Sequence, residues 1–147
     1  MGKIFFFRAD KANGIKDKNA FKEVLTFLFE NEKVGLKRLN YIFCSDEYLL
    51  KINQQYLMHN TLTDVITFPF SEKGKPVTAE IYVSVDRIKE NAKTYGIQYQ
   101  NELLRVMIHG ALHLCGYDDK RKPLKLKMQA KEDYYLNQFN VSREANT

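Results

Sequence analysis

Hydrophobic residues recur along this chain with two different spacings, which predict helices and strands. Between residues 17 and 32, apolar residues fall three or four positions apart, as on one face of an amphipathic helix; they are Phe21, Val24, Leu25, Leu28 and Phe29. Apolar residues alternate with polar ones at Leu39, Tyr41 and Phe43, which predicts a strand. The run Lys3–Phe7 predicts another short strand near the N-terminus.

Capping and turn residues divide the rest of the chain into further elements. Ser45 is a favourable N-cap for a helix that is expected to end near Tyr56. Gly74 and Pro76 separate two β-rich runs that predict a hairpin; the runs are Val65–Phe70 and Val77–Ser84. Three later helices are predicted from glycine C-caps and from a proline at a first helical position. They cover about Val85–Tyr95, ending before Gly96; Gln100–Cys115, ending before Gly116; and Pro123 to about Phe139.

The predicted order of elements is β-α-β-α-β-β-α-α-α, which lacks the regular alternation of a doubly wound sheet. It predicts an α+β fold, a small mixed β-sheet of about four strands packed with about five helices. The 147 residues match the usual size of one domain, roughly 100–150 residues. Since no linker or repeat interrupts the chain, we expect a single domain over 1–147.

The helix expected over 100–115 is apolar almost all round, which predicts a central, buried position. It carries His109 and His113, whose i,i+4 spacing places both imidazoles on one face, with Cβ atoms about 5–6 Å apart. Gly116 allows the chain to leave the helix and turn back, so that Asp119 returns as a third ligand. These three residues predict a metal site on the buried helix.

Three protein ligands leave one coordination position open, as in catalytic rather than structural zinc sites. A set of two histidines and one carboxylate also binds iron, so one zinc ion or another divalent transition metal is expected per chain. Cys115 lies on the far side of the helix and is excluded as a ligand. Zinc peptidases carry a glutamate general base after the first histidine, where this chain has Gly110, and this argues against a peptidase.

The net charge of +5 is concentrated in one segment, 120–131, which contains six basic residues and no acidic one. Because this segment begins next to Asp119, it predicts a surface for a polyanion beside the metal. Residues Lys120, Arg121, Lys122 and Lys125 are therefore expected to bind RNA. A solvated face of the last helix is the alternative interpretation.

Other classes of protein are excluded by what the chain lacks. The chain contains no run of about 18 apolar residues, so no membrane span is predicted. The apolar stretch near the N-terminus is shorter than the roughly 7–15 residues of a secretory signal. Cys44 and Cys115 are too few for a disulfide framework, and we expect both to be reduced thiols. These features predict a cytoplasmic protein.

Segment 109–119, with the sequence HGALHLCGYDD, resembles the metal-binding motif of the YbeY family of bacterial zinc-binding endoribonucleases. Segments 56–70 and 79–84 are similar to two further blocks of that family, and the resemblance covers about residues 46–138. Three positions depart from the family pattern. Asp119 replaces a histidine ligand, Leu57 replaces an arginine, and Ala79-Glu80 replaces Gly-Asp. His59 is a candidate substitute for the missing cation, although it also fits an exposed loop histidine.

The resemblance implies a single-strand-specific, metal-dependent endoribonuclease of ribosomal RNA maturation, acting in small-subunit 3′ end processing and ribosome quality control. Its expected partners are an RNA precursor and the ribosome or ribosomal proteins, with no DNA specificity. A general base is not identifiable from the sequence. Two alternatives stay open: a non-catalytic assembly factor whose zinc only stabilises the fold, and a metallohydrolase of peptides or small molecules.

Overall fold

A computed structural model describes residues 2–58 and 63–145, with side chains described as far as residue 140. Within this part of the chain, five helices accompany a four-stranded sheet. In chain order the elements are β1 (Ile4–Arg8), α1 (Lys18–Asn31), β2 (Leu36–Cys44), α2 (Asp46–Tyr56), β3 (Val65–Pro69), β4 (Val77–Ser84), α3 (Val85–Tyr95), α4 (Tyr99–Leu114) and α5 (Lys122–Ala145).

The strands lie in the order β1-β2-β4-β3. Strands β1, β2 and β4 are parallel, whereas β3 forms an antiparallel hairpin with β4 and occupies an edge of the sheet. The expected α+β architecture, with one mixed sheet, is therefore confirmed. Strand β3 pairs with β4 only, and several of its residues line the groove described below.

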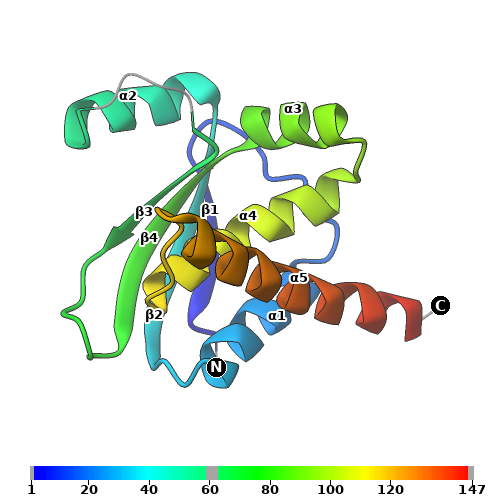
Figure 1. Ribbon diagram of the computed structural model, residues 1–147. Coiled ribbons are helices and arrows are strands. Elements are labelled where there is room, and N and C mark those ends of the chain that lie inside the picture. The colour runs from blue at the N-terminus through cyan, green and yellow to red at the C-terminus, as the bar shows by residue number, and fades with distance from the viewer. Residues whose placement is uncertain (1, 59–62, 146–147) are drawn as a thin grey trace.

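The helices pack on both faces of the sheet (Figure 1). Gly110 of α4 faces Thr67 of β3 and Ile81 of β4, so α4 covers one face. Ile66 and Tyr82, whose side chains point the opposite way, belong to a cluster with α2 on the other face. Helices α1 and α5 pack on the α4 side, where the main core lies.

The predicted element boundaries agree with the structure to within one or two residues, except at β2 and the last helix. Strand β2 begins at Leu36, three residues before the predicted Leu39, because an irregularity between Leu36 and Arg38 interrupts the alternating pattern. Ser45 caps α2 by accepting a hydrogen bond from the backbone N–H of Tyr48, and Gly96 caps α3 with a positive φ of 66°. Helix α5 starts at Lys122 rather than at Pro123, and it continues to Ala145 beyond the predicted end at Phe139. Phe139 is the last buried apolar residue among those whose side chains the structure describes.

Two other expectations concern the whole chain. Both cysteines are free thiols, as expected. No described helix combines the length and apolar character needed to cross a membrane.

Candidate metal centre

Helix α4 places His109 and His113 one turn apart, near its C-terminal end. The helix is anchored by a row of fully buried apolar residues; these include Leu103, Leu104, Met107, Ile108, Ala111 and Leu112. Gly116 then adopts a φ of 98°, a conformation that side chains rarely tolerate. The chain reverses there and brings Asp119 back over the two imidazoles.

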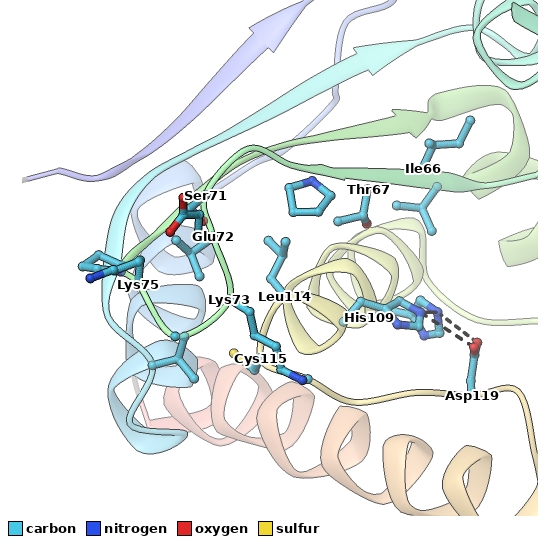
Figure 2. Close-up of a pocket in the computed structure, with 18 of the residues that line it drawn as sticks. Ile66, Thr67, Ser71, Glu72, Lys73, Lys75, His109, Leu114, Cys115 and Asp119 are labelled. Carbon is cyan, nitrogen blue, oxygen red and sulfur yellow. Dashed lines mark hydrogen bonds and ion pairs between the residues drawn. The ribbon is translucent and has the colours of Figure 1, made fainter. Parts of the chain in front are cut away.

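The three predicted ligands converge in space. The Nε2 atoms of His109 and His113 are 3.1 Å apart. The carboxylate oxygens of Asp119 lie 3.4 Å from Nε2 of His109 and 3.8 Å from Nε2 of His113, along the dashed lines in Figure 2. All three side chains are partly exposed, between 26% and 38%, so one side of the cluster faces a groove.

Both imidazoles are fixed through their other nitrogen. Nδ1 of His109 donates to a carboxylate oxygen of Glu132 at 2.6 Å, and Nδ1 of His113 donates to the backbone carbonyl of Tyr117 at 3.0 Å. Since these partners accept hydrogen bonds, the proton of each neutral ring lies on Nδ1. The two Nε2 lone pairs then face each other across 3.1 Å, an arrangement that a bound cation stabilises.

The donor set fits a transition-metal ion. Ligand atoms about 2.0–2.2 Å from a tetrahedral zinc are about 3.4 Å from one another. The two Nε2 atoms are 3.1 Å apart, Oδ2 of Asp119 is 3.4 Å from His109 and Oδ1 of Asp119 is 3.8 Å from His113, all close to this value. The Glu132–His109 contact is the carboxylate–histidine pair that commonly orients a metal-bound imidazole. The arrangement can therefore hold one ion with an open position on the groove side.

Charge around His109 favours a cation. Burial lowers the pKa of His109, but the hydrogen bond and charge of Glu132, with the charges of Asp119 and Asp64, outweigh burial and raise it above its usual value. A proton and a metal ion are both stabilised by such a field. Burial raises the pKa of the Cys115 thiol to about 12. Cys115 lines the same groove, but it is not among the three residues whose ligand atoms converge, which agrees with its exclusion as a ligand.

Two functional candidates were missed by sequence reasoning. Glu132 is buried in α5, where it continues the buried row formed by Met128, Tyr135 and Leu136. A single acid within an otherwise apolar stripe could have revealed it. Asp64 precedes β3 and lines the same groove as the histidines. Its pKa is raised, mainly by burial and against the lowering effect of His109.

The groove in front of the cluster has a volume of about 1450 Å³. It runs between the C-terminal end of α4 and the β3–β4 hairpin. In Figure 2, the hairpin residues Ser71, Glu72, Lys73 and Lys75 lie at one end, with His109 and Asp119 at the other. Lysine side chains line its walls; they are Lys33, Lys73, Lys75 and Lys120.

The predicted RNA-binding residues occupy two kinds of position. Lys120 lines the groove, directly after Asp119. Arg121, Lys122 and Lys125 are exposed at the start of α5 but are absent from the groove lining. The hairpin lysines come from a segment that sequence reasoning assigned only to a turn.

The departures from the family pattern also have defined positions. Leu57 is the C-cap of α2, is 41% exposed and lines the groove, so an apolar side chain stands where the family has a cation. His59, the candidate substitute, lies outside the described residues. Ala79 is buried in β4, whereas Glu80 is half-buried and its carboxylate accepts a hydrogen bond from the hydroxyl of Tyr82.

Gly110 has a structural reason to lack a side chain. A Cβ atom added there would lie 3.0 Å from Cδ1 of Ile81 and 3.3 Å from Oγ1 of Thr67. A side chain at this position would require Ile81 or Thr67 to shift, so close packing of α4 on the sheet favours glycine here.

Comparisons with known proteins agree with this geometry. A family model described as Endoribonuclease YbeY matches residues 7–140. The endoribonuclease YbeY of Flavobacterium psychrophilum is 51% identical over 116 residues, which cover 79% of this chain and 81% of that protein. That of Cytophaga hutchinsonii is 42% identical over 134 residues, covering 91% and 94%.

A similar structure has also been solved. The solution structure of a protein from Thermotoga maritima superposes with a TM-score of 0.70 at 31% sequence identity. The match covers 97% of this chain and 93% of the other. The likeness therefore includes the whole sheet and the helices that carry the candidate ligands.

Proposed function

The chain belongs to the YbeY endoribonuclease family, and on this basis we propose that it is a metal-dependent endoribonuclease that cleaves single-stranded RNA during ribosomal RNA maturation. The observation that carries the proposal is the convergence of His109, His113 and Asp119 at metal-ligand spacing on a lysine-lined groove. The proposed domain is one unit over 1–147. The proposed setting is the cytoplasm, with the RNA precursor and the ribosome as partners and no specificity for DNA.

The proposed ligands are His109, His113 and Asp119, and the proposed ion is zinc. A bound divalent ion would supply an acidified water and stabilise charge developing on a phosphate oxygen. The chain's own residues hold the donors in place. Glu132 and the carbonyl of Tyr117 fix the two rings so that both Nε2 atoms face the groove.

Asp64 is the proposed proton acceptor. Its carboxyl group lines the groove that contains the donor cluster, and its charge interacts with that of His109. A raised pKa brings a carboxyl group closer to the working pH, where general bases are most effective. Asp64 thus supplies the base that the sequence alone did not identify.

The groove walls match a polyanionic substrate. Four lysines line the groove, together with three acids, two of which lie at the reaction centre; the lysines are Lys33, Lys73, Lys75 and Lys120. Phosphate groups entering from the hairpin side would contact Lys73 and Lys75 before reaching Asp119. Processing of the small-subunit RNA 3′ end and ribosome quality control are the finer roles that we propose.

One observation supports a second candidate, a non-catalytic assembly factor. Leu57 places an exposed apolar side chain in the groove, which removes one phosphate contact from that wall. In that case the metal would only stabilise the turn between α4 and α5.

The deciding experiment compares the metal-loaded protein with a His109→Ala, His113→Ala double variant on single-stranded and structured RNA. Internal cleavage of single-stranded RNA by the wild type and none by the double variant is the expected result. Casein should stay intact in both preparations. Equal cleavage by both proteins would mean contamination, and no cleavage by either would favour the assembly factor. Elemental analysis of the same wild-type sample identifies the metal.

A further inference from the structure

A second groove lies on the face of the sheet opposite α4, between α2 and the β3–β4 hairpin strands. Its volume is about 510 Å³. Five aromatic rings line it; they are Tyr48, Tyr56, Phe68, Phe70 and Tyr82, and together they are called the aromatic groove below. None of these residues takes part in the metal centre.

Three of the five rings of the aromatic groove, those of Tyr48, Tyr56 and Phe70, are exposed. Tyr56 is 69% exposed and Phe70 is 63% exposed. Tyr48 and Tyr82 stack with centroids 6.5 Å apart and planes at 20°, and Tyr56 meets Phe68 edge-on at 6.1 Å. Large exposed aromatic rings are costly to hydrate and mark binding surfaces when they cluster.

Polar groups alternate with these rings. Lys51 and Gln55 project from α2, and Glu80 lies across from them on β4. One oxygen of Glu80 accepts a hydrogen bond from the Tyr82 hydroxyl at 3.2 Å. An unpaired nucleobase has apolar faces for the rings, an edge of donors and acceptors for Gln55 and Glu80, and an adjacent phosphate for Lys51. A purely apolar helix would offer no polar partner to Lys51 or Gln55, and Glu80 would keep only the hydroxyl of Tyr82.

The aromatic groove and the metal groove lie on opposite faces of the sheet, and β3, the edge strand, contributes residues to both. Alternate residues of a strand point to opposite faces. Thr67 and Pro69 of β3 line the metal groove, whereas Phe68 and the following Phe70 line the aromatic groove. The C-terminal end of α2 also contributes to both grooves, since its C-cap Leu57 lines the metal groove and Tyr56 lines the aromatic groove. A single strand that crosses β3 reaches both.

We propose that the aromatic groove is a stacking subsite for unpaired bases of the RNA strand whose phosphate lies at the metal centre. The inference rests on the proposed function and extends it, because it names residues that select single-stranded substrate. Paired bases cannot enter, since both of their faces are already stacked in the duplex. Stacking also tolerates any base, which suits a site without strict sequence preference.

The test uses the full chain, as purified with its metal, and an RNA of about twelve nucleotides carrying one 2-aminopurine, a length within the range of single-strand sites. The fluorescence of 2-aminopurine falls when the base stacks on a ring. Binding is measured without EDTA, so that the metal stays in place, and again with EDTA, which removes the metal and stops cleavage. The test variant is Tyr56→Ala with Phe70→Ala, at two positions exposed enough to leave folding intact.

Two control variants match it. Tyr56→Phe with Phe70→Tyr keeps both rings, and Tyr95→Ala removes an equally exposed tyrosine that lines neither groove. The alanine pair is expected to weaken RNA binding at least about 5-fold and to abolish the fluorescence quench, because one stacked base contributes that much or more. Both controls should behave as the wild type, with unchanged metal content. Lys51→Gln should flatten the salt dependence of log K by about 0.7.

Each other outcome is decisive. If the alanine pair binds and quenches as the wild type does while RNA is still cleaved, the stacking subsite is wrong and the proposed function stands. If the wild type neither binds nor cleaves RNA, the proposed function fails, and the subsite fails with it. If the alanine pair keeps RNA binding but no longer co-sediments with ribosomal subunits, the aromatic groove binds a protein, and the stacking subsite is again wrong.

Discussion

The imidazole of His109 and the carboxylate of Glu132 form a 2.6 Å hydrogen bond that joins α4 to α5 directly behind the candidate metal site. Glu132 is held in turn by Arg105, whose guanidinium lies 3.3 Å from its second oxygen. The orientation of one proposed ligand therefore depends on a residue 23 positions later in the chain.

Replacing Glu132 with glutamine should weaken metal binding about 10- to 100-fold, because the amide removes the negative charge that orients His109 and increases its basicity. Competition with a chelator of known affinity measures the effect. Asp133→Asn is the matched control, since Asp133 also pairs with Arg105, at 2.7 Å, but is exposed and does not contact His109. Equal metal affinity in both variants would mean that Glu132 serves only the helix packing.

Asp119→Ala should lose most of the bound metal while α4 stays intact, since two imidazoles alone leave the ion weakly held. Asp119→His should retain the metal, with an altered preference among metals, because histidine is an equally accepted ligand. Asp118→Ala, which removes an acid that caps the backbone N–H of Lys120, is the control. Full metal content in Asp119→Ala by elemental analysis would disprove its role as third ligand.

Asp64→Asn should lower the cleavage rate at least about 100-fold with metal content unchanged, as expected for loss of a general base. The wild-type rate should rise with pH as Asp64 loses its proton. Because burial raises the pKa of Asp64, that rise should lie above the usual range of an aspartate. A pH–rate profile measured for both proteins tests this. An unchanged acid limb in Asp64→Asn would assign proton transfer to another group.

Lys120→Gln should flatten the dependence of log K for single-stranded RNA on log salt by about 0.7, the value for one phosphate contact. Arg121→Gln provides the comparison, since Arg121 is also exposed but does not line the groove. If only the groove residues contact RNA, the slope for Arg121→Gln stays near that of the wild type, in contrast to the expectation from the charge pattern that Arg121 also binds RNA. An equal reduction in both variants would place the RNA along the start of α5, over the whole basic segment.

Glu32 should stabilise the fold in a pH-dependent way. Its carboxylate accepts hydrogen bonds from the hydroxyls of Tyr117 and Tyr135 and lies 3.4 Å from Nζ of Lys131. Burial acts to raise its pKa, but these partners lower it below the usual value of 4.5. Its contribution is therefore fully present above about pH 4.5 and is lost as the pH falls through the lowered pKa.

The matching variant is Glu32→Gln. Above pH 4.5 it should unfold with a free energy about 1–3 kcal/mol lower than that of the wild type, because hydrogen bonds to a charged group contribute about that much. Denaturant titrations at several pH values would show the two proteins converging as the solution becomes more acidic. A difference that is constant with pH would mean that the charge of Glu32 is irrelevant to stability.

The elements and the donor triad were predictable because their determinants are local. His109 and His113 are one helical turn apart, and Gly116 permits the reversal that returns Asp119 only three residues later. Glu132 and Asp64 were not predictable, because their roles depend on how α5 and β3 pack against α4. No spacing in the sequence encodes those contacts.

The lysine-lined groove could be predicted only in part from the sequence. The charge run 120–131 predicted a basic surface at α5, and Lys120 does line the groove. Lys73 and Lys75 belong to a hairpin turn, where lysine is ordinary, and their position opposite the ligands follows from the antiparallel pairing of β3 with β4. Likewise, the strand order β1-β2-β4-β3 depends on long-range pairing rather than on local pattern.

The close contact between Gly110 and the side chain of Ile81 restricts how this scaffold can change its chemistry. A Gly110→Glu substitution would have to be accommodated by a shift of Ile81 or of α4, because its Cβ would lie 3.0 Å from Cδ1 of Ile81. Any shift of α4 would move His109 and His113 together, since both belong to that helix. A glutamate at this position is therefore more compatible with an intact histidine pair when space is made in β4, for example by Ile81→Ala, at the expense of the core.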